Sequence, residues 1–151
     1  MTTAFSSIVV GTDGSSTATV ALGQAIGLAR SCGAALHIVS AYEPVPEGQL
    51  NVHPFAPPVE VQWTVHARQE VLTLLAAAEA QAREAGIAAV ETYARVGSAA
   101  DAILDVAEER AGDLIVVGNK GMTGATRFLL GSVPNKVSHH APCSVLIVRT
   151  G

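Results

Sequence analysis

A glycine-rich stretch near the C-terminus has the residue types and the spacing that favour the binding of an anion. Gly118 and Gly121 have no Cβ, so the chain can turn sharply there and expose its backbone amides to a bulky phosphate. Gly131 and Ser132 then lead into a predicted helix, whose first N–H groups have no partner within the helix. Those amides and the positive end of the helix favour phosphate, and Lys120 can add a point charge.

A second polar turn, Gly11-Thr12-Asp13-Gly14-Ser15, follows the first predicted strand. Asp13 has two compatible interpretations, as a helix-capping residue or as a contact for the ribose or base of a ligand. The glycines of both turns can also serve tight turns alone. The C-terminal stretch favours a ligand because it lies between a buried strand and the start of a helix. In open parallel sheets, ligands bind beyond the carboxyl ends of the strands, where the strand order reverses.

The elements that would position these turns follow from the apolar periodicity of the chain. Ser15, Ser98 and Ser132 precede or begin helical patterns, and Gly33 follows one. Strict alternation of strands and helices implies a mostly parallel sheet with right-handed crossovers and helices on both faces, in one α/β domain over residues 1–151. Strands are predicted at 7–12, 35–41, 90–96, 114–117 and 144–148, and helices at about 18–29, 61–84, 100–107 and 132–140.

Two of the predicted strands differ in their exposure. The 90–96 strand alternates apolar and polar residues, which indicates a place near a sheet edge, whereas 114–117 is a continuous apolar run typical of a central strand. Prolines between about residues 43 and 60 exclude a helix or a central strand there, so a loop of about 18 residues is expected.

Composition excludes several classes of protein. Of the 151 residues, 49% are apolar and only 15% are charged, which excludes disorder of the whole chain. The net charge of −4, with no basic run, makes nucleic acid an unsuitable partner. The sequence shows neither a secretory signal nor an apolar run long enough to span a bilayer, so we expect a soluble, cytoplasmic protein. Cys32 and Cys143 have no metal or redox spacing and are expected as reduced thiols.

Catalytic motifs are missing from the sequence. The five histidines do not suggest a metal site: His139 and His140 are adjacent and would point in different directions on a helix, and His37 is expected to face solvent from a strand. The G-x-S-x-G elbow of serine hydrolases is missing, and Lys120 precedes Gly121, whereas the lysine of a P-loop follows a glycine.

Several motifs in the same order and at the same separation resemble the universal stress protein family, over the whole chain. The central one is Gly118-x-x-Gly121-x9-Gly131-Ser132, which has the form of the nucleotide-binding signature of that family. Members without this signature do not bind ATP, so its presence favours binding. The other matching segments are 8–15, 111–118, 130–133 and 142–148.

The resemblance implies a Rossmann-like, five-stranded parallel sheet of order 3-2-1-4-5 and a homodimer joined along the last strand. It also implies that Asp13 and the backbone of Ala41 hold adenosine, while the glycine signature holds ribose and phosphates. Residues 40–42 and 131–134 are similar to a subgroup that prefers cyclic AMP. The predicted binding residues are Gly11, Thr12, Asp13, Ala41, Val117, Gly118, Lys120, Gly121, Gly131, Ser132 and Val133.

These observations favour a regulatory stress-response protein that binds an adenine nucleotide, ATP or cyclic AMP, with Mg²⁺ accompanying ATP. We do not expect catalysis as its main role. Two alternatives stay open: slow ATP hydrolysis through Asp13 and a divalent metal, and a dimeric interaction protein with a vestigial pocket. A receiver-type signalling domain is excluded, because its acidic pair, phosphorylatable Asp and C-terminal Lys are missing.

Overall fold

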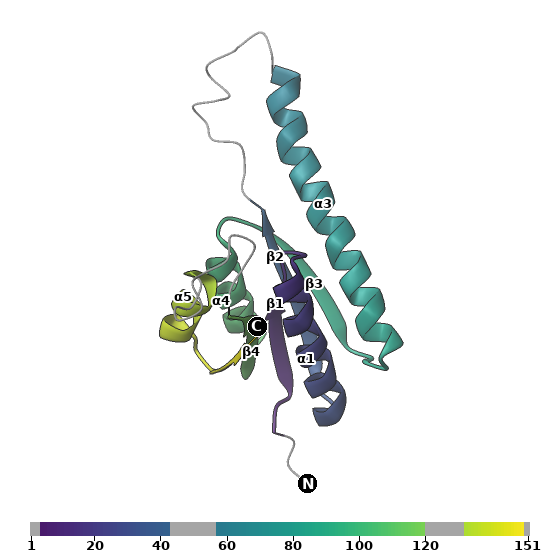
Figure 1. The fold of residues 1–151 in the computed structure, drawn as a ribbon, viewed down its shortest axis with the longest axis vertical. Helices are drawn as coiled ribbons and strands as arrows, with labels where there is room; N and C mark the ends of the chain where they lie inside the picture. The colour runs from purple at the N-terminus through teal and green to yellow at the C-terminus, as the bar shows by residue number, and fades with distance from the viewer. Residues whose placement is uncertain (1–3, 43–56, 120–131, 150–151) are drawn as a thin grey trace.

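The computed structural model describes residues 4–42, 57–119 and 132–149. Its elements form one parallel sheet in the order β3-β2-β1-β4-β5, which confirms the predicted class and strand order (Figure 1). All four strand pairings are parallel. The strands are β1 Ser7–Gly11, β2 Ala35–Tyr42, β3 Val90–Val96, β4 Leu114–Gly118 and β5 Ser144–Val148.

Two helical layers cover the sheet. Helices α1 (Ser16–Cys32) and α3 (Pro57–Glu84) pack on one face, and α4 (Ala99–Glu109) and α5 (Ser132–His140) on the other (Figure 1). Successive strand residues point to opposite faces, so Ile8 and Val10 join the first core and Val9 joins the second. Because both faces are covered, β1 and β4 are almost entirely apolar, as the sequence of 114–117 indicated.

Three of the residues predicted to begin or end helices do so in the structure. The Ser15 hydroxyl accepts a bond of 3.2 Å from the amide of Ala18, and the Ser98 hydroxyl accepts one of 3.2 Å from Asp101. Gly33 ends α1 with φ of 67°, a left-handed conformation that glycine adopts without steric cost. These caps fix where α1 and α4 begin, and both begin immediately after turns at the carboxyl edge of the sheet.

The predicted start of α3 is wrong by several residues. The sequence predicts a loop at Pro57 and Pro58, but these residues form the first turn of the helix. Proline is compatible with this position because the first N–H groups of a helix have no intrahelical acceptor. The remainder of the predicted loop, residues 43–56, lies outside the described residues. Ser132 is likewise the first helical residue of α5, whereas it was predicted as the cap that precedes the helix.

The prediction that His37 faces solvent is also wrong. His37 is 7% exposed, and its Nδ1 lies 2.9 Å from the hydroxyl of Tyr93. The Tyr93 hydroxyl donates to a carboxylate oxygen of Glu91 at 2.6 Å, so its oxygen accepts the proton of His37 Nδ1. Burial lowers the pKa of His37, with Glu91 opposing and Arg110 adding to this effect. Burial and the bond to Glu91 raise the pKa of Tyr93 to about 12, so this chain of bonds joins a neutral imidazole to a neutral phenol.

Candidate functional site

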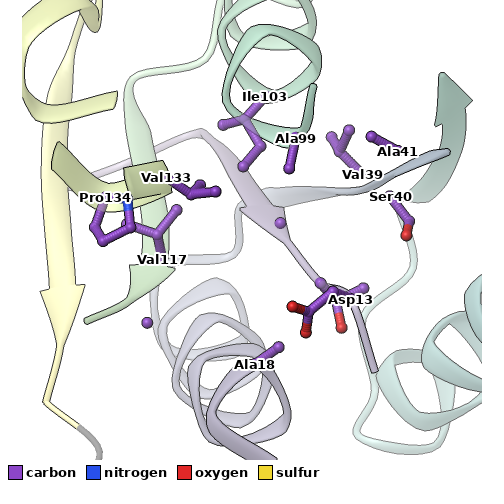
Figure 2. A pocket seen from close by; sticks show the side chains of 13 residues that line it. Asp13, Ala18, Val39, Ser40, Ala41, Ala99, Ile103, Val117, Val133 and Pro134 are labelled. Atoms are coloured by element: carbon purple, nitrogen blue, oxygen red, sulfur yellow. The ribbon is translucent and has the colours of Figure 1, made fainter. Parts of the chain in front are cut away.

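An open pocket with about 560 Å³ of free space lies at the carboxyl ends of β1, β2 and β4 (Figure 2). Strand β1 connects to β2 on one side, and β4 pairs on its other side, so the pocket occupies the point where the strand order reverses. Its lining residues are Gly11, Thr12, Asp13, Ala18, Val39, Ser40, Ala41, Ala99, Ile103, Val117, Gly118, Val133 and Pro134.

The turn after β1 forms a polar rim of the pocket. Its backbone is fixed by a bond of 2.9 Å from the amide of Thr12 to the carbonyl of Val39 on β2. The carboxylate of Asp13 accepts a bond of 2.9 Å from the amide of Ser15. This bond forms an Asx turn, whereas the cap of α1 is the Ser15 side chain and not Asp13. The turn therefore holds one exposed carboxylate, that of Asp13, at the mouth of the pocket (Figure 2).

Strand β2 and helix α4 together form an apolar wall of the pocket. Val39 and Ala41 belong to β2, and Ile103 and Ala99 belong to α4 (Figure 2). Ile103 is 2% exposed, and its Cδ1 would lie only 2.4 Å from a Cβ placed on Gly11. The absence of a side chain at Gly11 is therefore what allows Ile103 to lie against β1 beneath the pocket. An apolar wall of aliphatic side chains suits a flat, largely apolar ring.

The opposite end of the pocket is built from β4 and α5. Gly118 ends β4, and Val133 and Pro134 belong to the first turn of α5. The N-terminus of α5 therefore lies at the pocket, where its amides and the positive end of its dipole favour an anion. Lys136 of α5 forms a 2.8 Å ion pair with Asp101 of α4, and this pair joins the two helices that border the pocket.

Seven of the eleven predicted binding residues line this one pocket. Ser132 adjoins it as the first residue of α5 and is exposed, but it does not line it. Lys120, Gly121 and Gly131 lie outside the described residues. The residues that do line it are Gly11, Thr12, Asp13, Ala41, Val117, Gly118 and Val133.

Sequence reasoning missed six lining residues, which are Ala18, Val39, Ser40, Ala99, Ile103 and Pro134. Val39 and Ser40 could have been found, because they precede Ala41 at the carboxyl end of a predicted strand. Ala99 and Ile103 carry no local signal of binding. Their approach to β1 depends on how α4 packs across the sheet.

Within the described ranges, no group of three or more His, Cys, Asp or Glu side chains is placed to hold a metal ion. Nor does any helix in the described part of the chain have the length and hydropathy needed to cross a membrane. The His37–Tyr93–Glu91 chain of bonds lies apart from the pocket, since none of its three residues lines it.

Comparison with known proteins places this chain in a family. The sequence profile of the universal stress protein family matches residues 4–149. A universal stress protein of Mycobacterium tuberculosis is 37% identical over 147 residues, which cover 97% of this chain and 98% of the relative.

Two solved structures with similar folds contain nucleotides. One is a universal stress protein in complex with cAMP, 33% identical, with a TM-score of 0.71 and coverage of 97% of this chain and 98% of that one. The other is the universal stress protein of Archaeoglobus fulgidus in complex with dAMP, 26% identical, with a TM-score of 0.60 and coverage of 94% and 96%.

Proposed function

Because the chain belongs to the universal stress protein family, we propose that it is a stress-response protein that binds an adenine nucleotide in the pocket beyond β1. The observation that carries the proposal is the order in which apolar, polar and anion-favouring surfaces follow one another along the carboxyl edge of the sheet. An apolar space between β2 and α4 is followed by the polar turn of β1 and then by the N-terminus of α5. A nucleotide has the same sequence of parts: a flat base, a hydroxylated sugar and an anionic phosphate.

The order of the strands sets the direction of the ligand in this proposal. Phosphate oxygens lie at Gly118 and the first turn of α5, where the first helical amides have no acceptor within the helix. The base lies between Ala41 and Ile103, and Asp13 accepts hydrogen bonds from the sugar or the base. Lys120, Gly121, Gly131 and Ser132 complete the phosphate end of the site in this proposal.

The structural neighbours support an adenine nucleotide as the ligand in this proposal. One structural neighbour contains cAMP and another dAMP, and both have adenine and a single phosphate. We propose that cyclic AMP and ATP are the physiological candidates for this chain. If Mg²⁺ accompanies ATP, Asp13 is the carboxylate placed to contact it, and oxygens of the triphosphate and of water would be its other ligands.

Binding, rather than catalysis, is the proposed role. Among the lining residues in the described part of the chain, Asp13 is the only one with a titratable side chain. A single exposed carboxylate provides neither an acid–base pair nor a cluster that could hold two metal ions. The proposed output is a change in partner affinity between the nucleotide-bound and the free protein.

We also propose that two copies pair along β5. This strand is at an edge of the sheet, and Leu146 is 37% exposed on it. An apolar edge strand with unpaired backbone groups is suited to association with a second strand.

Equilibrium titration by calorimetry tests the proposed function. We expect one saturable site per chain, with dissociation constants below the millimolar range for at least one of ATP, AMP and cyclic AMP. GTP, GMP and cyclic GMP serve as controls whose charges match those of ATP, AMP and cyclic AMP, and we expect each to bind at least tenfold more weakly than its adenine counterpart. Equal binding of all the nucleotides, or of none, would contradict an adenine-specific site.

A further inference from the structure

Ser40 has an unusual environment among the polar residues of the described core. The structure buries three polar side chains there, those of Thr12, His37 and Ser40. The Thr12 hydroxyl accepts a bond of 3.3 Å from the amide of Gly14, and His37 is bonded to Tyr93. Ser40 is only 4% exposed, yet its hydroxyl has no hydrogen-bond partner among the described residues.

A buried hydroxyl without a partner reduces the stability of the protein that carries it. Removing such a group from water without a compensating bond costs about 1–3 kcal/mol in proteins. An alanine at this position of β2 would avoid the cost, and alanine occupies the next position, residue 41. A buried polar group without a protein partner calls for an explanation, and a partner from outside the chain is one explanation at a residue that lines a pocket.

The position of Ser40 indicates which ligand group that partner is. Ser40 lines the pocket, and strand alternation places its side chain on the opposite face of β2 from Val39 and Ala41. Figure 2 shows its hydroxyl on the same side of the sheet as the side chains of Asp13 and Ala18. The hydroxyl therefore faces the α1 side of the pocket. The pocket reaches both sides of the sheet there, since Ala18 of α1 and Ile103 of α4 both line it and the pairing of β1 with β2 ends at Gly11 and Val39.

Ser40 lies far across the sheet from Gly118 and α5, the end of the pocket where we propose that the phosphate binds. Strand β1 lies between β2 and β4, and neighbouring strands are about 4.8 Å apart, so β2 and β4 are roughly 10 Å apart. A phosphate held at Gly118 and α5 is thus out of hydrogen-bond range of Ser40. The base is the part of the nucleotide that reaches β2.

We propose that the Ser40 hydroxyl hydrogen-bonds a polar edge atom of the bound base and is a specificity-determining residue of this pocket. This inference rests on the proposed function, since it assigns a contact within the same nucleotide site. A hydroxyl can donate to a ring nitrogen or accept from an exocyclic amine, so either edge of adenine can satisfy it. In this proposal the base supplies the hydroxyl with a partner that the described residues of the free protein do not provide.

The test is Ser40→Ala, measured in two ways on the full chain. Titration with AMP is expected to show about a tenfold weaker affinity, because one buried hydrogen bond is lost. Adenosine, which has no phosphate, is expected to lose the same factor. The melting temperature of the ligand-free variant is expected to equal or exceed that of the wild type, because no bond is broken in the free protein.

Ser7→Ala is the matched control, with the same substitution in the same sheet. The Ser7 hydroxyl donates to the carbonyl of Arg110 at 3.2 Å, at the amino end of β1 and away from the pocket. We expect the opposite pattern for this control: a slightly lower melting temperature and unchanged affinity for AMP and adenosine.

The outcomes separate this inference from the proposed function. If the wild type binds AMP and Ser40→Ala binds it with the same affinity, the inference is overturned and the proposed function stays intact. A loss of affinity for AMP without one for adenosine also overturns it, since the contact would be with the phosphate. A ligand-free variant that melts several degrees below the wild type shows a structural partner for the hydroxyl and overturns it too. Failure of the wild type to bind any adenine compound overturns both.

Discussion

Replacing Gly11 with alanine is expected to weaken adenine nucleotide binding about thirtyfold. A Cβ at this position would lie 2.4 Å from Cδ1 and 3.0 Å from Cγ1 of Ile103, so the Ile103 side chain must move. Both residues line the pocket, so the displaced side chain would enter the space in which we propose that the base binds. Filling that space costs about 2 kcal/mol of binding free energy, in the range found when one methylene too many is forced into a packed site.

Calorimetric titration of the variant with AMP checks this expectation, and Gly27→Ala provides its control. Gly27 lies in α1, and an added Cβ there has no neighbour within 4 Å. The control should bind AMP with unchanged affinity and be more stable by about 0.5–1 kcal/mol, since alanine favours a helix over glycine. Wild-type affinity in the Gly11 variant would show that the base lies elsewhere.

Replacing Asp113 with alanine is expected to lower the free energy of unfolding by about 2 kcal/mol. The carboxylate accepts bonds of 2.8 Å from the amide of Ser6, 3.0 Å from its hydroxyl and 3.0 Å from the amide of Ser7. These bonds join the start of β1 to the start of β4, at the centre of the sheet. Bonds to a charged group contribute about 1.5–3 kcal/mol each, and their partial exposure to solvent reduces the sum.

The contribution of Asp113 should also depend on pH. Burial raises the pKa of Asp113, but the bonds from Ser6 and Ser7 outweigh burial and hold the pKa below its ordinary value of 3.8. The folded state therefore favours the ionised form, so the stabilisation is present above about pH 4 and is lost as the pH falls through the folded pKa.

Urea unfolding of the wild type and the variant at pH 7 and at pH 3 measures this dependence. The difference in stability between the two proteins should be largest at pH 7 and smaller at pH 3. Asp105→Ala, an exposed residue of α4, should change stability by less than about 0.5 kcal/mol at either pH. A difference that is constant with pH would mean that the carboxylate contributes by packing and not by accepting these bonds.

The fold was predictable because its signals are local. Five apolar runs alternate with helical patterns, and Ser15, Gly33 and Ser98 mark helix ends through bonds to near neighbours in the chain. The strand order, in contrast, came from the resemblance of whole motifs to a family, since alternation alone leaves several orders open. The error at Pro57 and Pro58 has a local cause, because proline is compatible with the first turn of a helix and not with its interior.

The site was predictable only where it lies on the turns themselves. Asp13 and Gly118 end strands, and the carboxyl edge of a parallel sheet is where a ligand is expected. Ile103 was not predictable, because its approach to Gly11 depends on tertiary packing between α4 and β1. His37 was misplaced for the same reason: its partner Tyr93 is 56 residues away in the chain.

Mapping the bound nucleotide by NMR is the most direct test of the central claim, that an adenine nucleotide lies across the carboxyl edge of the sheet. Backbone amide signals of the ¹⁵N-labelled protein should shift on addition of AMP at Thr12, Asp13, Ala41, Gly118 and Val133, in one saturable transition. Amides at the amino ends of the same strands, such as Ser7 and Leu114, should stay in place. Shifts confined to those amino ends, or to residues outside the pocket, would contradict the account.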